Sequence, residues 1–236
     1  MSVPESTRRT KANRRRGPAK PSRLSRELIA RTALELADRE GVEGLSMRRV
    51  ASELGVTAMS LYTYFRDKDE LIDAVLDAGA SEMTLPSEKG PWKRQMRALM
   101  WEIRRSVERH PIALRLRLAR PIMTPGALRG PELGMRILTR AGFSDANAVS
   151  AWRALFSYTL GFASFSSEPG QAEARRHARL ALAALPEEEF PTLSAASAEI
   201  AAAMGGDEQF EFGLARLLDG LEMACLPGDK LRTLDR

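Results

Sequence analysis

Apolar residues along this chain are spaced for helices. Over residues 25–225 they recur every three or four positions, which gathers them on one face of an α-helix. No stretch sustains the alternation of apolar and polar residues that a half-buried β-strand shows. Prolines and glycines divide the pattern into segments, as at Pro111, Pro121, Pro125 and Gly142. The sequence therefore predicts an all-α fold.

The length and composition allow a globular protein of one or two domains. The chain has 236 residues, 44% of them hydrophobic, which is enough for a sizeable core. Cys225 is the only cysteine, which excludes an internal disulfide and is typical of a reducing compartment. No run approaches the roughly 18 consecutive apolar residues of a membrane span, and the basic N-terminus lacks the apolar stretch of a secretory signal. We therefore expect a cytoplasmic protein that does not bind a membrane.

The positive charge is concentrated at the N-terminus. The chain carries a net charge of +5, but residues 1–26 hold nine Lys or Arg and one acidic residue, so this segment has +8 and the remainder −3. Residues 1–24 contain several prolines and few apolar residues, and we expect them to be disordered on their own. They are either a passive solvated tail or a basic arm that follows DNA phosphates or enters a minor groove.

Residues 25–80 contain four short helical segments with recognisable starts. Each segment is preceded by a residue type that caps helix N-termini, namely Ser25, Ser46, Thr57 and Asp67. Gly55 lies between the second and third segments, where a sharp turn requires a positive φ. Helix, glycine turn and second helix form the pattern of a helix-turn-helix, whose second helix enters the major groove of DNA.

The second helix of this motif has a composition suited to reading DNA. Leu61 and Phe65 are enough to anchor one side of it. Nearby, Ala58 can contact thymine methyl groups, Arg48 can pair with guanine, and Lys68 can hold a phosphate at a helix N-terminus. Hydroxyl groups that can reach phosphates or bases belong to Thr57, Ser60, Tyr62, Thr63 and Tyr64.

Spacing alone does not establish that these residues bind DNA. Glycine turns between helices occur in many proteins, and Tyr62 and Tyr64 are equally compatible with ordinary packing. Residues 27–70 contain six basic and nine acidic residues, which argues against a strong phosphate-binding surface. The basic segment upstream offsets this deficit only if it acts as an arm.

The order of several motifs in residues 29–78 resembles the N-terminal domain of the TetR family of transcriptional repressors. These motifs are ALELA at 33–37, GVEGLSMRRVA at 41–51, LGV at 54–56, SLYTYF at 60–65 and DKDEL at 67–71. Resemblance to the tetracycline-repressor branch comes from ARP at 119–121, AGFS at 141–144 and YTLGF at 158–162. The resemblance implies a three-helix helix-turn-helix domain at residues 25–80, a larger helical ligand-binding and dimerisation domain at 81–226, and a tail at 227–236.

The resemblance also implies roles at a DNA interface. Positions that contact the DNA backbone in the family are matched by Ser46, Thr57, Tyr62 and Lys68. Positions that can reach bases are matched by Arg48, Ala58, Ser60 and Tyr64. This chain has Thr63-Tyr64 where the tetracycline-repressor branch often has Trp-His. We therefore expect its operator preference to differ from that of the branch.

A homodimer on a palindromic operator is the expected assembly. The long helices that start near Ser144 and Asp207 are apolar on more than one side, as are helices that face a partner. A palindromic site needs two recognition helices about one DNA turn apart. The resemblance implies that helices at these positions form a four-helix bundle between subunits. A monomer with a thick core is the alternative.

The resemblance further implies a pocket for a small-molecule effector. Candidate apolar contacts are Met96, Met100, Trp101, Met123, Trp152 and Phe156, and candidate polar contacts are Arg104 and Asn147. The histidine with which tetracycline repressors bind a magnesium-chelated drug falls near Leu116, and His110 and His177 lack metal-ligand spacing. We therefore expect no metal, no cofactor, and a bulky, largely apolar effector. Each candidate also fits an ordinary place in the helical core.

Two other functions are compatible with parts of the sequence. An all-α enzyme is disfavoured, because the chain lacks a nucleophile elbow, a phosphate-binding loop and a dinucleotide fingerprint. A helix-turn-helix protein that binds DNA without any effector fits residues 25–80 as well as a repressor does. Release from DNA by a small molecule would distinguish these two regulators.

Overall fold

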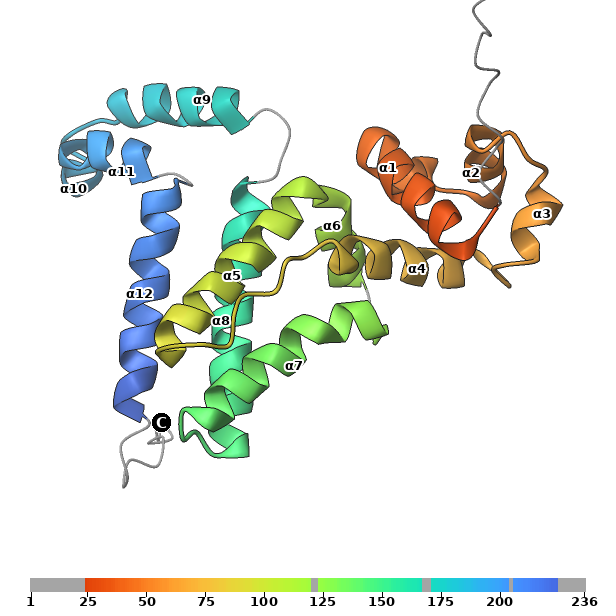
Figure 1. The fold of residues 1–236 in the computed structure, drawn as a ribbon. Coiled ribbons are helices and arrows are strands. Elements are labelled where there is room, and N and C mark those ends of the chain that lie inside the picture. Colours follow the sequence, from red (N-terminus) through yellow and green to blue (C-terminus); the bar gives the residue numbers. More distant parts are fainter. Residues whose placement is uncertain (1–23, 120–122, 167–170, 204–205, 225–236) are drawn as a thin grey trace, which may run out of the picture.

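The computed structural model describes residues 24–119, 123–166, 171–203 and 206–224. Within these ranges the chain is helical and contains no β-strand, which confirms the predicted all-α fold (Figure 1). No helix in the same ranges is long and apolar enough to cross a membrane. The predicted arm, residues 1–24, and the predicted tail, residues 227–236, lie outside the described residues except for Leu24.

The first four helices form an N-terminal unit. They are α1 (Arg26–Gly44), α2 (Met47–Glu53), α3 (Ala58–Tyr62) and α4 (Lys68–Ser81). The side chains of Ser25, Ser46 and Asp67 each accept a hydrogen bond from the backbone N–H three residues on, at 2.8–3.2 Å, as predicted for helix caps. The prediction for Thr57 was wrong in one respect. Thr57 precedes α3, but its hydroxyl pairs with that of Ser60 at 3.0 Å instead of capping the backbone.

The remaining helices form a larger C-terminal part. They are α5 (Trp92–Arg109), α6 (Pro111–Ala119), α7 (Pro125–Arg140), α8 (Asp145–Ser166), α9 (Gln171–Ala183), α10 (Pro191–Ala195), α11 (Ser197–Ala203) and α12 (Asp207–Ala224). Helices α5, α7, α8 and α12 run alongside one another as a bundle (Figure 1). Helices α9, α10 and α11 lie together at one end of this bundle (Figure 1).

The N-terminal unit and the C-terminal part each have an apolar core. The bundle core joins Met96 and Met100 of α5 to Phe210 of α12, together with side chains of α7 and α8. The core of the N-terminal unit includes Ile112 and Leu116 of α6, although α6 follows α5 in the chain. Helix α4 contacts α1, α6 and α7. Helices α4 and α6 therefore connect the N-terminal unit to the bundle.

Candidate DNA-binding surface and effector cavity

The turn between α2 and α3 places α3 at the surface of the N-terminal unit (Figure 1). Gly55 has a φ of 68°, which residues with a Cβ rarely adopt, and the chain turns there. Val56 N donates to Ala51 O at 3.0 Å and closes the end of α2. Leu61 and Phe65 are 0% and 1% exposed and anchor α3 to the core of the unit. The opposite side of α3 is left open to another molecule.

The predicted DNA contacts lie on or beside α3. Those that are exposed are Ser46, Arg48, Thr57, Tyr62, Thr63 and Lys68. Those that are half-buried are Ala58, Ser60 and Tyr64. Met59 is 74% exposed on the same short helix and adds a large apolar contact. Hydroxyl and apolar groups of the predicted set are thus accessible to another molecule, while the contact roles of the individual residues stay predictions.

Tyr64 has its polar groups engaged within the N-terminal unit. Its hydroxyl donates to Leu24 O at 2.9 Å, and Arg26 donates to its backbone carbonyl. The ring is half-buried against the core of the unit. In this conformation the Tyr64 hydroxyl is bonded to Leu24, and a contact between Tyr64 and bases stays a prediction.

The two adjacent arginines of α2 have different surroundings. Arg48 is exposed. Arg49 donates to Glu40 at 3.1 Å and to Glu53 at 2.9 Å, and these hydrogen bonds raise the pKa of Arg49. Arg39 also donates to Glu53, at 2.7 Å, which together with Arg49 lowers the pKa of Glu53. Arg49 therefore ties α2 to α1, and Arg48 is the arginine of this pair that can reach DNA.

Glu70 organises the segment between α3 and α4. Its carboxylate accepts hydrogen bonds from Arg66 N and from Arg26 Nη2, each at 2.8 Å. The Arg66 N–H, followed by Arg26, lowers the pKa of Glu70 to about 2. The carboxylate therefore stays charged until the pH falls to about that value. These bonds hold the start of α4, and with it the exposed Lys68, beside α3.

A small, partly enclosed cavity lies where α4, α5, α6, α7 and α8 meet. Its volume is about 30 Å³, which is enough for about one water molecule. The wall is apolar apart from Ser106 and includes Met83, Ile103, Val107 and Leu160. These residues were not predicted as effector contacts. In the sequence they are ordinary apolar helix positions, and only the crossing of the helices brings them together.

An open groove of about 560 Å³ lies outside this cavity, along α7 and α8. Phe156 and Leu160 line both the groove and the cavity, so their side chains separate the two. Trp152 extends the wall of the groove and stacks on Phe156 with ring centroids 5.4 Å apart. Glycine at position 134 leaves room for this indole, because a Cβ there would lie 2.2 Å from the ring. Movement of Phe156 would join groove and cavity into one larger site.

The apolar residues predicted to contact an effector are dispersed in the structure. Met96 and Met100 are completely buried in the bundle core. Met123 is 75% exposed just before α7. Trp152 and Phe156 line the groove, and of all the predicted contacts Phe156 alone lines the cavity.

Leu116 and Asn147 lie apart from the cavity. Leu116 packs in the core of the N-terminal unit, because α6 turns back onto α1 and α4. Asn147 is half-buried at the start of α8, nine residues before Phe156, which is about 13 Å along a helix. The structure therefore does not bring these two predicted contacts together with Phe156.

Arg104 and Trp101 are engaged in holding α12 against α5. Arg104 is 3% exposed and pairs with Glu108 at 2.7 Å and with Asp207 at 2.9 Å. Trp101 Nε1 donates to Glu211 at 2.8 Å. Neither Arg104 nor Trp101 lines the cavity or the groove. Their contacts within the fold account for their positions without an effector.

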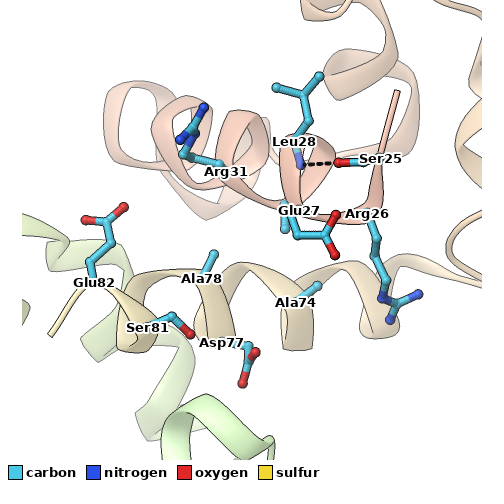
Figure 2. A pocket seen from close by; sticks show the side chains of 11 residues that line it. Ser25, Arg26, Glu27, Leu28, Arg31, Ala74, Asp77, Ala78, Ser81 and Glu82 are labelled. Atoms are coloured by element: carbon cyan, nitrogen blue, oxygen red, sulfur yellow. Dashed lines mark hydrogen bonds between the residues drawn. The ribbon is translucent and has the colours of Figure 1, made fainter. Parts of the chain in front are cut away.

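A third hollow, of about 700 Å³, lies between α1 and α4 (Figure 2). Arg31 of α1 and Glu82 beyond the end of α4 bring charges of opposite sign to it, and Ala74 and Ala78 form its α4 wall. Asp77 turns toward α7, where it accepts a hydrogen bond from Gly126 N at 2.6 Å. This hollow is more open and carries charges, so the apolar cavity is the better candidate for an apolar effector.

Family profiles match both parts of the chain. Residues 29–75 match the bacterial regulatory proteins of the tetR family. Residues 85–225 match the tetracyclin repressor-like C-terminal domain. The two matches therefore span the N-terminal unit and the bundle.

Similar proteins include repressors and a regulator solved with a small molecule. The HTH-type transcriptional repressor DrrR1 of Streptomyces coeruleorubidus is 36% identical over 220 residues, which cover 88% of this chain and 80% of that protein. The tetracycline repressor protein class C of Escherichia coli is 29% identical over 216 residues, which cover 90% and 97%. The crystal structure of Streptomyces coelicolor ActR in complex with actinorhodin has a TM-score of 0.74 at 30% identity, covering 88% of this chain and 100% of that one. The chain belongs to the tetR family of bacterial regulatory proteins.

Proposed function

We propose that this protein is a transcriptional repressor that binds a palindromic operator as a homodimer and is released by a small, largely apolar effector. The observation that carries the proposal is the course of α4. This helix starts beside α3 at Lys68, and its later residues Leu76 and Ala80 form part of the cavity wall. One rigid helix thus touches both the surface suited to DNA and the cavity suited to an effector.

Effector binding would act on DNA binding through α4. The cavity holds about one water molecule in this conformation, so an effector must displace side chains such as Phe156 and the flexible Met83. The Asp77–Gly126 hydrogen bond couples α4 to α7, which forms another wall. An effector that binds better when α4 has moved favours a state in which the two α3 helices no longer match successive major grooves.

Exposed apolar side chains support a homodimer. On α8, Val149 and Phe165 are 47% and 76% exposed, and on α12, Phe212 and Met223 are 59% and 66% exposed. Large apolar side chains that remain in water on two long helices are typical of a surface that a partner covers. A second copy of the chain would bring a second α3 to the other half of a palindrome.

Selection of bound sites from random duplex DNA tests the proposed DNA binding. We expect a short palindrome to be enriched by the wild type. Arg48→Ala should lose about 1–3 kcal/mol of preference at the base it reads. Arg49→Ala is the matched control, because Arg49 is engaged by Glu40 and Glu53. This variant should select the same palindrome as the wild type. No enrichment at low salt would contradict the helix-turn-helix interpretation.

Operator release tests the proposed effector response. Actinorhodin, the molecule bound in the ActR structure, is a suitable first probe. Dose-dependent loss of the operator complex would support a ligand-responsive repressor. A complex that persists with actinorhodin and with a panel of bulky apolar compounds would support a DNA-binding protein without an effector. If the protein converts a compound to a product and has no affinity for DNA, the result would support the all-α enzyme.

The basic arm has a separate test. Deleting residues 1–22 removes seven Lys or Arg residues. If the arm follows DNA phosphates, the slope of log affinity against log salt concentration should become less steep by several units. Each neutralised phosphate contributes roughly 0.9 to the slope. The slope is measured by titrating operator DNA at a series of salt concentrations. An unchanged slope would identify residues 1–22 as a passive tail.

A further inference from the structure

His110 lies where four helices of the two parts, α1, α4, α5 and α6, come together. It follows the last residue of α5 and precedes Pro111, the first residue of α6. Its ring nitrogen Nδ1 is 2.6 Å from Asp38 Oδ2 of α1, and Nε2 is 2.9 Å from Glu82 Oε2 at the end of α4. The side chains of His110 and Asp38 are 14% and 20% exposed, whereas the Glu82 side chain is 42% exposed. We name this trio, Asp38–His110–Glu82, the histidine clasp.

The clasp joins elements that otherwise belong to different parts of the molecule. Asp38 lies on α1, which carries the core of the N-terminal unit. His110 lies at the end of α5, which belongs to the bundle core. Glu82 follows α4, the helix that contacts α1, α6 and α7. The clasp therefore sits at the joint about which the N-terminal unit can move relative to the bundle.

Both contacts require a charged ring. A neutral imidazole carries one N–H and can donate to only one carboxylate, whereas the imidazolium donates from both nitrogens. Gly79 lies beside the ring without a side chain of its own, and the neighbouring Arg109 pairs with Glu102 at 2.8 Å. Within the part of the chain that the structure describes, Asp38 of α1 and Glu82, just after α4, are the charged groups that contact the His110 ring.

The carboxylates also alter the titration of the ring. The hydrogen bond to Asp38 raises the pKa of His110 most, burial opposes it, and the bond to Glu82 raises it further. With a raised folded pKa, the clasp contributes fully below the ordinary pKa of 6.5 and is lost as the pH rises through the folded value. At weakly acidic pH the charged ring keeps both contacts, and the clasp is closed. At alkaline pH the neutral ring can donate to only one carboxylate, and the clasp is open.

We propose that the histidine clasp couples the orientation of the N-terminal unit to the bundle, and that the charge on His110 makes this coupling dependent on pH. The proposal rests on the proposed function, because the coupling has a regulatory effect only if the N-terminal unit binds DNA. When the clasp is closed, displacement of α4 by an effector carries α1 with it. When the clasp is open, α1 no longer follows, and effector-driven release from DNA weakens.

The first test measures the joint in the protein alone. Amide hydrogen exchange is compared between wild type and His110→Gln at matched pH, from about pH 6 to pH 9. At pH 6 we expect the α1 amides around Leu34–Asp38 to exchange on the order of tenfold faster in His110→Gln, because bonds between charged groups are lost. The difference should disappear at alkaline pH. His177→Gln is the matched control, since His177 is exposed on α9 and should behave as wild type.

The second test titrates the ring directly. In His177→Gln the remaining imidazole signal in a proton NMR spectrum belongs to His110, and its midpoint should lie above 6.5. Asp38→Asn should lower that midpoint. The proposal is overturned if the midpoint lies at or below 6.5. It is also overturned if the α1 amides exchange equally fast in wild type and His110→Gln at pH 6. Neither readout uses DNA or an effector, so failure of the clasp is distinguishable from failure of the proposed function.

Discussion

Replacing Arg104 by alanine is expected to lower the free energy of unfolding by about 3 kcal/mol, the low end of the range for breaking a buried ion pair. The Arg104 side chain is 4% exposed and bonds to Glu108 and Asp207, so it connects α5 to α12. Its guanidinium carbon lies 4.8–5.1 Å from the ring centroids of three aromatic residues, Trp101, Phe162 and Phe210. The substitution removes these contacts and leaves a void among the rings. Asp207 is 77% exposed, so the acid left behind is solvated, which keeps the loss near the lower limit.

Arg105→Ala is the matched control for this prediction. Arg105 is exposed and lies over the Trp101 ring alone, at 5.6 Å. A cation–π contact at such a site contributes about 0.5–1 kcal/mol, so the loss should be correspondingly small. Urea unfolding measures the free energy of unfolding of both variants. The protein concentration is kept the same, because the stability of the proposed homodimer would depend on it. Equal losses in the two variants would contradict a specific role for Arg104 in docking α12.

Phe65→Ala is expected to cost about 3–5 kcal/mol and to abolish operator binding. Phe65 is 1% exposed and, with Leu61, forms the attachment of α3 to the core of the N-terminal unit. Arg26 also lies over its ring, at 4.3 Å from the centroid. Loss of the ring leaves α3, five residues long, without half of its anchor. Isolated helices of this length do not persist in water, so the recognition surface should be lost with the packing.

Tyr62→Ala separates loss of structure from loss of contact. Tyr62 is 48% exposed on α3, and a surface substitution of this kind should change stability by no more than about 0.5 kcal/mol. If Tyr62 contacts the DNA backbone as predicted, operator affinity should nevertheless fall. Thermal unfolding and operator titration are measured for both variants. Phe65→Ala protein that binds the operator like wild type would show that α3 does not depend on this anchor.

The helices of the N-terminal unit could be predicted from the sequence because their signals are local. Ser25, Ser46 and Asp67 cap helices through bonds to the residue three positions on, and Gly55 turns the chain by its own φ. Such interactions depend on neighbours in sequence. The starts of these helices and the turn before α3 could therefore be anticipated, while the DNA contacts stay predictions. The bond of the Tyr64 hydroxyl to Leu24 has no local signal, because the two residues are 40 positions apart.

The candidate effector cavity could not be predicted in the same way. Large and flexible side chains such as Met96 and Met123 suggested a pocket, yet one is completely buried and the other 75% exposed. The cavity is lined instead by ordinary apolar residues, including Ile103 and Val107. Periodicity assigns an apolar residue to the inner face of its helix but does not say which helices cross there. A hollow forms only where side chains from several helices fail to fill the space between them.

The sequence by itself determined the all-α fold, the helix-turn-helix and the uneven charge, because each follows from residue spacing or composition. The tertiary structure decided the rest. It turned α6 back onto α1 and α4, so that Leu116 packs in the core of the N-terminal unit. It also brought Asp38 and Glu82 to the two nitrogens of His110 from 72 and 28 positions away. The physical reason is that such contacts depend on how helices distant in the chain pack, and no local signal encodes that arrangement.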